Sequence, residues 1–310
     1  MNFVVSVAII TYNHEYYISK AIESALMQST NFNFDIVIGE DCSTDRTRQI
    51  CEDFAQKDGR IKLLPSEKNL GASLNFSRTL KSCNGKYIAL LEGDDFWTDH
   101  LKLQKQVDLL DNNHEFSFCF TDRMIVDDKD ILLRERSIPE SKRRILSYSD
   151  ILSGFTPPTQ TVLFRAELLD AQILDTMKIV FNGDTLLFGY LSTKGYAGYL
   201  NSVTSTYRQH YGGMYSQINH ITRLKHKLFT LGKLLEVVDN LKYKKSISKA
   251  IGVSLVRLFV LYFKEGQYLE SCKILFKIIK LDLEMYSIYF LKGLKLLIIN
   301  IFRKNYPITD

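Results

Sequence analysis

The first 121 residues alternate between short, wholly apolar runs and longer segments whose apolar residues have helical spacing. An apolar, β-branched run such as Val4–Ile10 is typical of a strand buried on both faces of a parallel sheet. Spacings of three and four residues, as at Ile18, Ala21 and Ile22, predict an amphipathic helix. The pattern predicts strands over Val4–Ile10, Phe34–Ile38, Ile61–Leu64, Tyr87–Leu91 and Ser117–Thr121, and helices over Ser19–Gln28, Asp45–Lys57, Gly71–Ser82 and Leu101–Leu110. This alternation predicts an α/β domain with a mostly parallel sheet and right-handed crossovers.

The pattern changes in the second half of the chain. Residues 127–149 are polar and charged, which indicates a surface excursion, and Thr159–Arg165 predicts a further strand. Residues 177–199 contain another predicted helix, and residues 221–302 have helical periodicity with almost no strand pattern. We therefore expect an α/β domain over residues 1–220 and a mainly helical region over residues 221–310.

Composition supports a folded chain with two unlike regions. Of the 310 residues, 45% are hydrophobic and 24% are charged, and there are only 5 Pro and 16 Gly, which excludes collagen-like and Pro/Gly-rich disordered classes. The formal net charge of +5 is unevenly distributed, because residues 224–310 hold 16 Lys or Arg against 7 Asp or Glu. A basic region next to an acidic one suggests two tasks, one of them at an anionic surface.

Cysteine usage and the apolar segments bear on the compartment. The 5 Cys residues are odd in number and include no CxxC pair, which argues against a disulfide framework and against a zinc ribbon. We expect reduced thiols in a cytoplasmic protein. The N-terminus has no basic start before its apolar run, so it predicts a first strand instead of a signal peptide. Ile251–Phe263 and Leu291–Phe302 are both shorter than the roughly 18–20 residues that span a bilayer.

Three polar clusters directly follow predicted strands, namely Thr11–His14, Glu40–Asp45 and Glu92–Asp95. The carboxyl ends of parallel strands meet at one edge of the sheet, where ligands bind in folds of this class. We therefore expect the three clusters to converge on one cleft, although they are far apart in the sequence.

The cluster Glu92-Gly93-Asp94-Asp95 places three carboxylates within four residues after a buried strand. Mg²⁺ and Mn²⁺ prefer oxygen ligands and are commonly held by one or two carboxylates together with substrate phosphates. Such an ion would neutralise the charge that develops on a diphosphate leaving group. The alternative is an acidic turn that caps the following helix.

Four segments in order resemble the family 2 glycosyltransferases. They are Ser-Val-Ala-Ile-Ile-Thr-Tyr-Asn, Glu-Asp-Cys-Ser-Thr-Asp-Arg-Thr, Asn-Leu-Gly, and Gly-Lys-Tyr-Ile-Ala-Leu-Leu-Glu-Gly-Asp-Asp-Phe-Trp, and the resemblance covers residues 3–215. It implies the GT-A fold, which is a Rossmann-like, mostly parallel sheet flanked by helices. It also implies transfer of a sugar from a nucleotide-diphosphate donor with Mn²⁺ or Mg²⁺ as cofactor, and it says little about residues 222–310.

The resemblance also implies roles for individual residues. Asp95 would hold the metal, Asp94 the ribose or sugar, and Asp41 the edge of the base, with Tyr12 able to stack on the base. The nucleotide-sugar set that it implies is Thr11, Tyr12, Asn13, Asp41, Asn69, Asp94 and Arg208. Many relatives carry Ala-Arg-Asn after Asn-x-Gly, whereas this chain has Asn75-Phe76-Ser77. Arg78 comes two positions later, and either replaces the phosphate-binding Arg or lies on a solvated helix surface.

Two further segments complete the expected site. In this family an acid in the segment Phe181–Thr185 acts as the catalytic base, and here that acid is Asp184, whose alternative role is to cap a helix. The segment Tyr207–Gly213 resembles a Tyr-Arg-x-His element, so Arg208 would clamp phosphate and His210 would bind the metal. The alternative for this segment is a polar strand end before a Gly turn. We expect the other histidines, such as His14, to lie on the surface.

The basic C-terminal region has two interpretations. Its Lys residues interleave with Leu, Ile and Phe, which suits an amphipathic surface against anionic lipid headgroups at the inner face of the cell membrane. Alternatively, it is a helical subdomain with solvated Lys residues. Nucleic-acid binding is not expected, since no recognition motif accompanies the charge.

Together these features predict an inverting, metal-dependent glycosyltransferase, most simply with a UDP-sugar donor. The acceptor would be a glycan or a lipid-linked glycan in surface polysaccharide synthesis. A sugar-nucleotide pyrophosphorylase would need a Gly-rich basic loop after the first strand, where this chain has Thr11-Tyr12-Asn13-His14-Glu15. A degenerate nucleotide-sugar-binding or membrane-associated scaffold module is the other alternative, because Gly183 stands where relatives often have a second acid.

Overall fold

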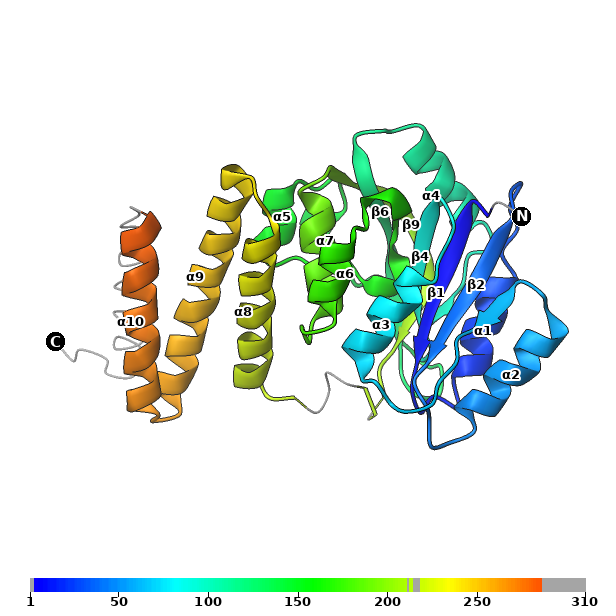
Figure 1. Ribbon diagram of the computed structural model, residues 1–310, viewed down its shortest axis with the longest axis horizontal. Coiled ribbons are helices and arrows are strands. Elements are labelled where there is room, and N and C mark those ends of the chain that lie inside the picture. The colour runs from blue at the N-terminus through cyan, green and yellow to red at the C-terminus, as the bar shows by residue number, and fades with distance from the viewer. Residues whose placement is uncertain (1–2, 211, 214–217, 286–310) are drawn as a thin grey trace. The chain divides into compact units, whose positions relative to one another are not determined.

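The computed structural model describes residues 3–210, 212–213 and 218–285 (Figure 1). Its strands are β1 (Val5–Thr11), β2 (Phe34–Glu40), β3 (Ile61–Leu63), β4 (Tyr87–Glu92), β5 (Phe96–Trp97), β6 (Phe116–Val126), β7 (Leu132–Arg134), β8 (Leu163–Arg165) and β9 (Tyr196–Arg208). Its α-helices are α1 (Ile18–Leu26), α2 (Thr47–Lys57), α3 (Ala72–Lys81), α4 (Lys102–Asp111), α5 (Tyr148–Leu152), α6 (Ala171–Met177), α7 (Gly183–Ser192), α8 (His220–Val237), α9 (Leu241–Lys264) and α10 (Tyr268–Met285). Three 3₁₀ turns are η1 (Glu140–Lys142), η2 (Thr159–Thr161) and η3 (Ala166–Leu168).

The strands form one mixed sheet in the order β3-β2-β1-β4-β8-β6-β9-β5, with β7 paired to β6. Strands β1 to β4 are parallel, as the apolar runs predict, and β1 pairs with β2 on one side and with β4 on the other. β8 runs antiparallel to both β4 and β6, whereas β6 and β9 are parallel. The expected Rossmann-like sheet is therefore confirmed in its first half and becomes mixed in its second half.

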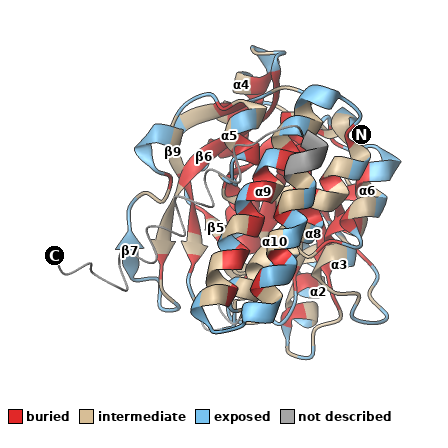
Figure 2. Cartoon of the chain, turned by 90° about the vertical axis from the view of Figure 1, so that its left-hand side faces the viewer, coloured by how far each residue is buried: buried red, intermediate tan, exposed pale blue. Residues whose placement is uncertain are grey.

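Helices cover both faces of this sheet (Figure 1). The side chains of Val5, Val7 and Ile9 pack against apolar residues of α1, α2 and α4. On the other face α3 contacts β1 and β2, and α6 and α7 follow next to it. Gly39 of β2 allows α3 to approach closely, because a Cβ atom there would overlap the side chain of Thr79. Outside this core, β7 is exposed along its whole length (Figure 2).

The predicted elements of the first 121 residues are confirmed to within a few residues, but one later prediction is wrong. The strand that we predict over Thr159–Arg165 is split into the turn η2 and the short strand β8. The helix predicted within residues 177–199 is confirmed as α7, whereas the long strand β9, which begins at Tyr196, was not predicted. Tyr-, Thr- and Ser-rich strands such as β9 are half polar, so their pattern differs from that of a buried parallel strand.

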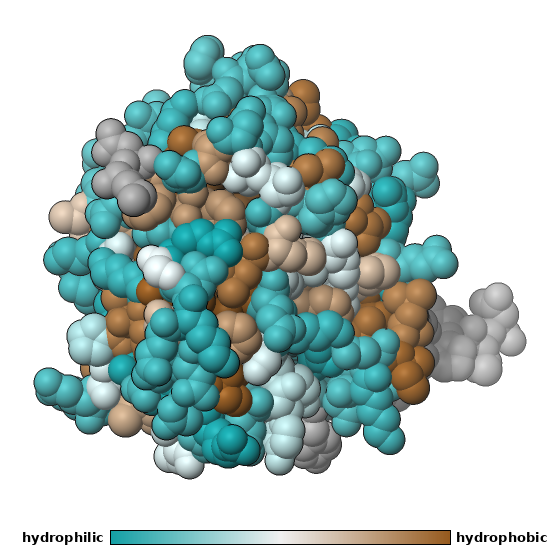
Figure 3. Space-filling view, turned by 90° about the vertical axis from the view of Figure 1, so that its right-hand side faces the viewer, coloured by the Kyte–Doolittle hydropathy of each residue, from teal (hydrophilic) through white to brown (hydrophobic). Residues whose placement is uncertain are grey.

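The chain divides into two compact units, Met1–Gln217 and Ile218–Asp310. The face of the molecule seen in Figure 3 is mainly hydrophilic, with apolar side chains scattered across it. The domain boundary that we expect after residue 220 stays a prediction, since compactness alone does not show that either unit folds independently.

In the second unit the described residues form α8, α9 and α10. Side chains of Asn219 and Asn240 accept hydrogen bonds from backbone N–H groups in the first turns of α8 and α9, so both residues act as N-caps. Residues of all three helices share one apolar cluster around Leu258 and Ile278. By length and composition α9 is long enough to cross a membrane, whereas the shorter apolar run Ile251–Phe263 did not predict this. Half of the most apolar stretch of α9 is buried within the protein.

One charged side chain is enclosed in the core of the first unit. Lys102 of α4 is fully buried, and its Nζ lies 4.4 Å from the centroid of the Trp97 ring and donates to Gln106 Oε1. Burial lowers the pKa of Lys102 to about 7, because the charged ammonium is poorly solvated there.

We predict that Lys102→Met changes how stability depends on pH. The unfolded Lys has a pKa of about 10.4, so between pH 7 and pH 9.5 the unfolded state binds more protons than the folded state. The free energy of unfolding of the wild type should therefore rise with pH, relative to that of Lys102→Met, by about 2–3 kcal/mol. Urea unfolding at both pH values measures this difference. Lys81→Met, at an exposed position of α3, is the control and should show no such change. The prediction is contradicted if the free energies of unfolding of wild type and Lys102→Met differ by the same amount at both pH values.

Candidate functional site

The loops that follow β1 and β2 are locked together by reciprocal hydrogen bonds. Asn13, which has a φ of 54°, donates its N–H to Ser43 Oγ, and its Oδ1 accepts from the N–H of Thr44. The N–H of His14 donates to Thr47 Oγ1. Beyond the ends of the strands, the backbone N–H groups no longer pair with a neighbouring strand. Short polar side chains accept their hydrogen bonds instead.

Asp45 is the second link between the two loops. Its carboxylate accepts from the N–H groups of Glu15 and Thr47 at 3.1 and 2.9 Å. Burial by itself would raise the pKa of Asp45, but hydrogen bonds from Thr47 and from the Glu15 backbone outweigh it and hold the pKa below its usual range.

Asp41, the residue expected at the base edge, lies beside the turn that precedes α3. Its two carboxylate oxygens accept from the N–H groups of Leu70 and Gly71 at 2.9 and 2.8 Å, and its side chain is buried. Asn69 also accepts from the N–H of Gly71, which has a φ of 82°. Asp41 thus joins the β2 loop to the Asn-Leu-Gly turn, and its contact with a base stays a prediction.

The three residues expected at the first strand end differ in exposure. Thr11 is 3% exposed, and its hydroxyl lies 3.2 Å from Nδ1 of His14. Tyr12 is 42% exposed, and Asn13 is also exposed. Tyr12 and Asn13 can therefore meet a ligand directly, whereas Thr11 faces the protein.

Gly93 sets how closely the acidic loop after β4 approaches the end of β1. A Cβ atom on Gly93 would overlap the side chain of Thr11 and would lie 3.1 Å from Nδ1 of His14. Because Gly has no Cβ, the backbone fits at this point, and Asp94 comes within reach of the loop after β1.

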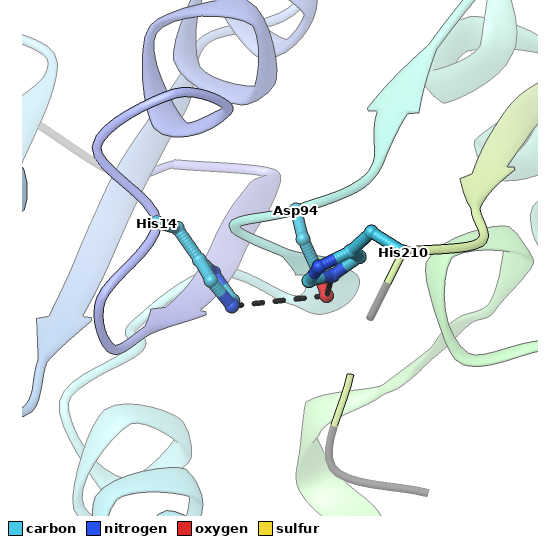
Figure 4. A group of neighbouring side chains, drawn as sticks. All are labelled: His14, Asp94 and His210. Carbon is cyan, nitrogen blue, oxygen red and sulfur yellow. Dashed lines mark hydrogen bonds and ion pairs between the residues drawn. The ribbon is translucent and has the colours of Figure 1, made fainter. Parts of the chain in front are cut away.

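Three side chains meet at this place from three separate strand ends (Figure 4). Asp94 Oδ2 lies 3.0 Å from Nε2 of His210 and 3.7 Å from Nε2 of His14. One ligand atom from each residue fits within 4.8 Å of the others, which is a spacing that a single metal ion can bridge. A carboxylate and two imidazoles suit Mn²⁺ as well as other first-row divalent ions.

The electrostatics of this group favour an ionised Asp94 and a deprotonated His14. Burial tends to raise the pKa of Asp94, but the hydrogen bond to His210 and the charges of His14 and His210 lower it overall. Burial lowers the pKa of His14, against the attraction of Asp94. A neutral imidazole has the lone pair that a metal ion requires.

The assignment of Asp95 as a metal ligand stays a prediction, and the structure places its side chain against the backbone of Arg208. The Asp95 side chain is buried, and its Oδ1 accepts from the backbone N–H of Arg208 at 2.8 Å. Burial and the nearby charges of Asp94 and Glu92 raise the pKa of Asp95 well above its usual range. The carboxylate that lies beside His210 is that of Asp94, because successive residues after the strand point in different directions.

The role of Arg208 as a phosphate clamp stays a prediction, and the structure shows which protein groups its side chain contacts. Its side chain is 3% exposed and donates to the backbone oxygen of Asp94 and to Oδ1 of Asp130, at 3.1 and 2.6 Å. Its guanidinium also lies over the rings of Tyr17 and Phe96. Arg208 therefore holds the acidic loop in place from behind, while its neighbour His210 reaches the site.

Asp184 lies in the first turn of α7, where its Oδ1 accepts from the N–H of Thr185 at 2.7 Å. Burial raises the pKa of Asp184. Burial also raises the pKa of Glu92 to about 8, and the negative charges of Asp94 and Asp184 add to this effect. Glu92 thus links the Asp94 group electrostatically to Asp184. Gly183, where relatives often have an acid, faces the Phe76 ring, which lies 2.9 Å from the position of a Cβ atom.

Sequence reasoning missed two residues and left one open. His14 is not a surface residue but a member of the group around Asp94, and its place in a cluster after a strand was the available indication. Asp130 comes from the surface excursion, and its contact with Arg208 could not be inferred from spacing. Arg78 donates to the backbone oxygens of Glu40 and Pro65, so it joins loops and does not lie on a solvated surface.

Comparison with known sequences identifies similar proteins. The model of the family described as "Glycosyl transferase family 2" matches residues 6–170. An uncharacterized protein of Mycobacterium tuberculosis is 37% identical over 166 residues, which are 52% of this chain and 47% of that protein. The chain thus spans about half the length of that relative. The putative teichuronic acid biosynthesis glycosyltransferase TuaG of Bacillus subtilis is 31% identical, over 66% of this chain and 78% of TuaG. The Escherichia coli UDP-Glc:alpha-D-GlcNAc-diphosphoundecaprenol beta-1,3-glucosyltransferase WfgD is 34% identical, over 42% of this chain and 50% of WfgD.

Two solved structures have a similar fold. S. aureus TarS, residues 1–349, in complex with UDP-GlcNAc has a TM-score of 0.62 at 21% identity, over 84% of this chain and 73% of that chain. The mannosyltransferase PcManGT from Pyrobaculum calidifontis, in complex with GDP-Man and Mn²⁺, has a TM-score of 0.57 at 13% identity. That alignment covers 96% of this chain and 87% of the mannosyltransferase. At these identities the likeness establishes the GT-A architecture.

We predict that Asp45→Ala loosens the two interlocked loops. Two backbone N–H groups lose their acceptor, which should lower the free energy of unfolding by about 1–2 kcal/mol at pH 7. Because the folded pKa of Asp45 is depressed, its contribution is present above the unfolded pKa of about 4 and is lost as the pH falls through the folded value. The difference in free energy of unfolding between wild type and Asp45→Ala should therefore become smaller as the pH falls from 7 to 3, as measured by urea unfolding. Asp53→Ala, at an exposed position of α2, is the control, and an equal loss in both variants would refute the prediction.

Proposed function

The chain belongs to glycosyl transferase family 2, and on that premise we propose an inverting, metal-dependent enzyme that transfers a sugar from a nucleotide-diphosphate donor to a glycan or lipid-linked acceptor. The observation that carries this proposal is the meeting of His14, Asp94 and His210 at the carboxyl edge of the sheet. The exposed residues Tyr12 and Asn13 lie in the adjoining loop, where a base can be bound.

The proposed metal ligands are Asp94 and His210, with His14 as the third member of the group. One carboxylate and two imidazoles fit Mn²⁺ better than Mg²⁺, which prefers oxygen ligands alone. A bound divalent ion would neutralise the negative charge of the departing diphosphate. The Mn²⁺ in the complex of the Pyrobaculum mannosyltransferase with GDP-Man supports this choice of ion. Arg208 orients the group by holding the backbone of Asp94.

Asp184 is the proposed catalytic base. In an inverting transfer the acceptor hydroxyl oxygen attacks the anomeric carbon while the bond from that carbon to the diphosphate oxygen breaks, and a base takes up the hydroxyl proton. Burial raises the pKa of Asp184, which makes its carboxylate a stronger base than an exposed aspartate. The charge of Asp184 raises the pKa of Glu92, which supports a position of Asp184 near Glu92 in the same site.

For the donor we propose a UDP-sugar, and for the acceptor a growing surface glycan that is linked to a lipid. The UDP-Glc donor and the diphosphoundecaprenol acceptor named for WfgD support this proposal, as does the UDP-GlcNAc bound to TarS. The name of TuaG, which refers to teichuronic acid synthesis, points to the same class of product.

The proposal is tested by turnover of nucleotide sugars. The full chain is incubated with a panel of UDP-, GDP- and TDP-sugars and Mn²⁺, and released nucleotide is measured. Asp94→Asn and His210→Gln should lower turnover at least a hundredfold and raise the Mn²⁺ concentration needed for half-maximal rate. Asp184→Asn should lower turnover to a similar extent while leaving the Mn²⁺ requirement unchanged, since this residue acts on the acceptor.

The matched control for these variants is Asp53→Asn, on the exposed face of α2. Tight binding of nucleotide sugars by the wild type without turnover on any acceptor would sink the proposed enzyme and favour the scaffold module. Turnover by Asp184→Asn at the wild-type rate would remove that residue as the base.

We further propose that the protein is cytoplasmic and meets the inner face of the membrane through α10. Leu269 and Phe276, seven residues apart on one helix face, are 71% and 74% exposed. Lys273 and Lys277 are exposed on the same helix. Apolar side chains flanked by Lys suit the boundary between acyl chains and anionic headgroups.

The membrane contact is tested by flotation of the full chain with vesicles. Binding should be strong with phosphatidylglycerol and weak with phosphatidylcholine alone, and should fall with rising salt. Joint substitution of Lys273→Gln and Lys277→Gln should weaken binding about thirtyfold, since each Lys contributes about 1 kcal/mol. Lys57→Gln with Lys68→Gln, both exposed in the first unit, is the charge-matched control. Equal binding by the two double variants would remove α10 as the contact.

A further inference from the structure

The turn η2 crosses the sheet next to the proposed site and is fixed by its backbone. It packs against β4, β6 and β9. Trp97 Nε1 donates to the backbone oxygen of Gln160, and Gln106 Nε2 donates to that of Thr161, each at 2.9 Å. The buried Lys102 contacts both the Trp97 ring and Gln106. A network of buried side chains thus holds a three-residue turn in one position.

This network fixes the direction of the Gln160 side chain. Oε1 of Gln160 accepts from Nη1 of Arg123 at 3.2 Å, and the side chain is only 1% exposed. A guanidinium has donors and no acceptor, so the amide oxygen must face Arg123 and the amide nitrogen must point away from it. Within the described residues Nε2 of Gln160 is buried and has no hydrogen-bond partner. A buried N–H donor without a partner is costly, so a ligand or a water is expected there.

Three side chains near Gln160 come from neighbouring strands of the sheet. Trp97, Ser205 and Arg123 lie side by side on β5, β9 and β6, so their side chains share the face of the sheet that η2 covers. Ser205 Oγ is buried in the same row and has no partner in the described part of the chain. Arg123 is held in turn by Ser137 and lies over the Tyr207 ring.

Glu92 connects this row to the proposed metal ligand and the proposed base. Thr159 of η2 donates a side-chain hydrogen bond to Glu92, and the charges of Arg123, Asp94 and Asp184 all act on its carboxyl group. Its Oε2 is buried, and no described residue bonds to it. In the described residues, the Gln160 donor and one Glu92 carboxyl oxygen therefore both lack a partner in the same region of the site.

We propose that Gln160 is a specificity-determining residue whose Nε2 donates a hydrogen bond to a hydroxyl oxygen of the transferred sugar. This inference rests on the proposed function and deepens it. A sugar hydroxyl can accept a hydrogen bond from Nε2 of Gln160 and can also exchange a hydrogen bond with the Glu92 carboxyl group, which donates or accepts according to its protonation. A donor lacking that hydroxyl leaves Nε2 buried and unpaired, which should lower kcat/KM about tenfold to a hundredfold.

The test pairs Gln160→Glu, which keeps an oxygen for Arg123 but puts a carboxyl group in place of the amide, with Gln160→Met, which has no hydrogen-bond donor at all. Affinities for UDP and for the UDP-sugar that the wild type turns over are measured by calorimetry with Mn²⁺, alongside KM and kcat. The UDP affinity should stay within about twofold and the melting temperature should be unchanged, while kcat/KM for the UDP-sugar should fall about tenfold to a hundredfold. Gln160→Met, which also removes the Arg123 contact, should show the same loss. Gln172→Glu, the same change at an exposed position of α6, is the matched control.

A second measurement identifies the hydroxyl. Wild type and Gln160→Glu are compared on UDP-glucose and on its 2-, 3-, 4- and 6-deoxy analogues, or on the deoxy forms of whichever sugar is turned over. For one deoxy analogue, kcat/KM of the wild type should fall by about the same factor as Gln160→Glu causes with the parent sugar. For that analogue, Gln160→Glu should lower kcat/KM little further, because the contact is already missing.

Each outcome separates the two proposals. No turnover of any nucleotide sugar by the wild type contradicts the proposed function itself. Wild-type turnover with unchanged kcat/KM in Gln160→Glu overturns the inference alone and leaves a buried water on Nε2. A loss of UDP affinity as large as the loss of kcat/KM for the UDP-sugar also overturns it, because Gln160 would then support the fold of the site. A rise confined to the KM of the acceptor overturns it too, because Gln160 would then act on the acceptor.

Discussion

The close approach of the acidic loop to the end of β1 is the constraint on which the rest of the site depends. β1 and β4 are neighbours in parallel register, so their carboxyl ends meet, but the side chains after them meet only if the backbones pass at short range. Gly93 permits that passage because a Cβ atom would overlap Thr11. Asp94 then lies between His14 and His210, which belong to segments about 200 residues apart in the sequence.

Hydrogen bonds from backbone N–H groups to aspartate side chains join these loops. The carboxylate oxygens of Asp41 and Asp45 accept hydrogen bonds from backbone N–H groups of neighbouring loops, and one oxygen of Asp95 accepts from the N–H of Arg208. A buried carboxylate that accepts several N–H groups is stable only in one arrangement, because any shift leaves a donor unpaired. The acids of the family motifs thus divide into two kinds, those that build the loops and those that remain available to a ligand.

The second half of the sheet completes the site with elements whose patterns are weak. β9 brings Arg208 and His210 behind and beside the acidic loop, and η2 brings Thr159 and Gln160 next to Glu92. The first unit therefore supplies two kinds of polar group at one edge, a possible metal-binding group and a set of buried donors and acceptors. A sugar with a charged leaving group needs both kinds, which is consistent with the family to which the chain belongs.

The amino-acid sequence by itself determined the family, the parallel half of the sheet and the edge at which the polar clusters gather. Apolar, β-branched runs and helical spacing are local signals, and the carboxyl ends of parallel strands must converge whatever the details of packing. Only the tertiary structure decided which acid faces His210, that His14 joins the group, that Arg208 is enclosed, and that β8 and β9 make the sheet mixed. These outcomes depend on side-chain direction after a strand and on contacts between residues far apart in the chain, such as Asp130 with Arg208. Neither is encoded in spacing, because both are set by the packing of the whole first unit.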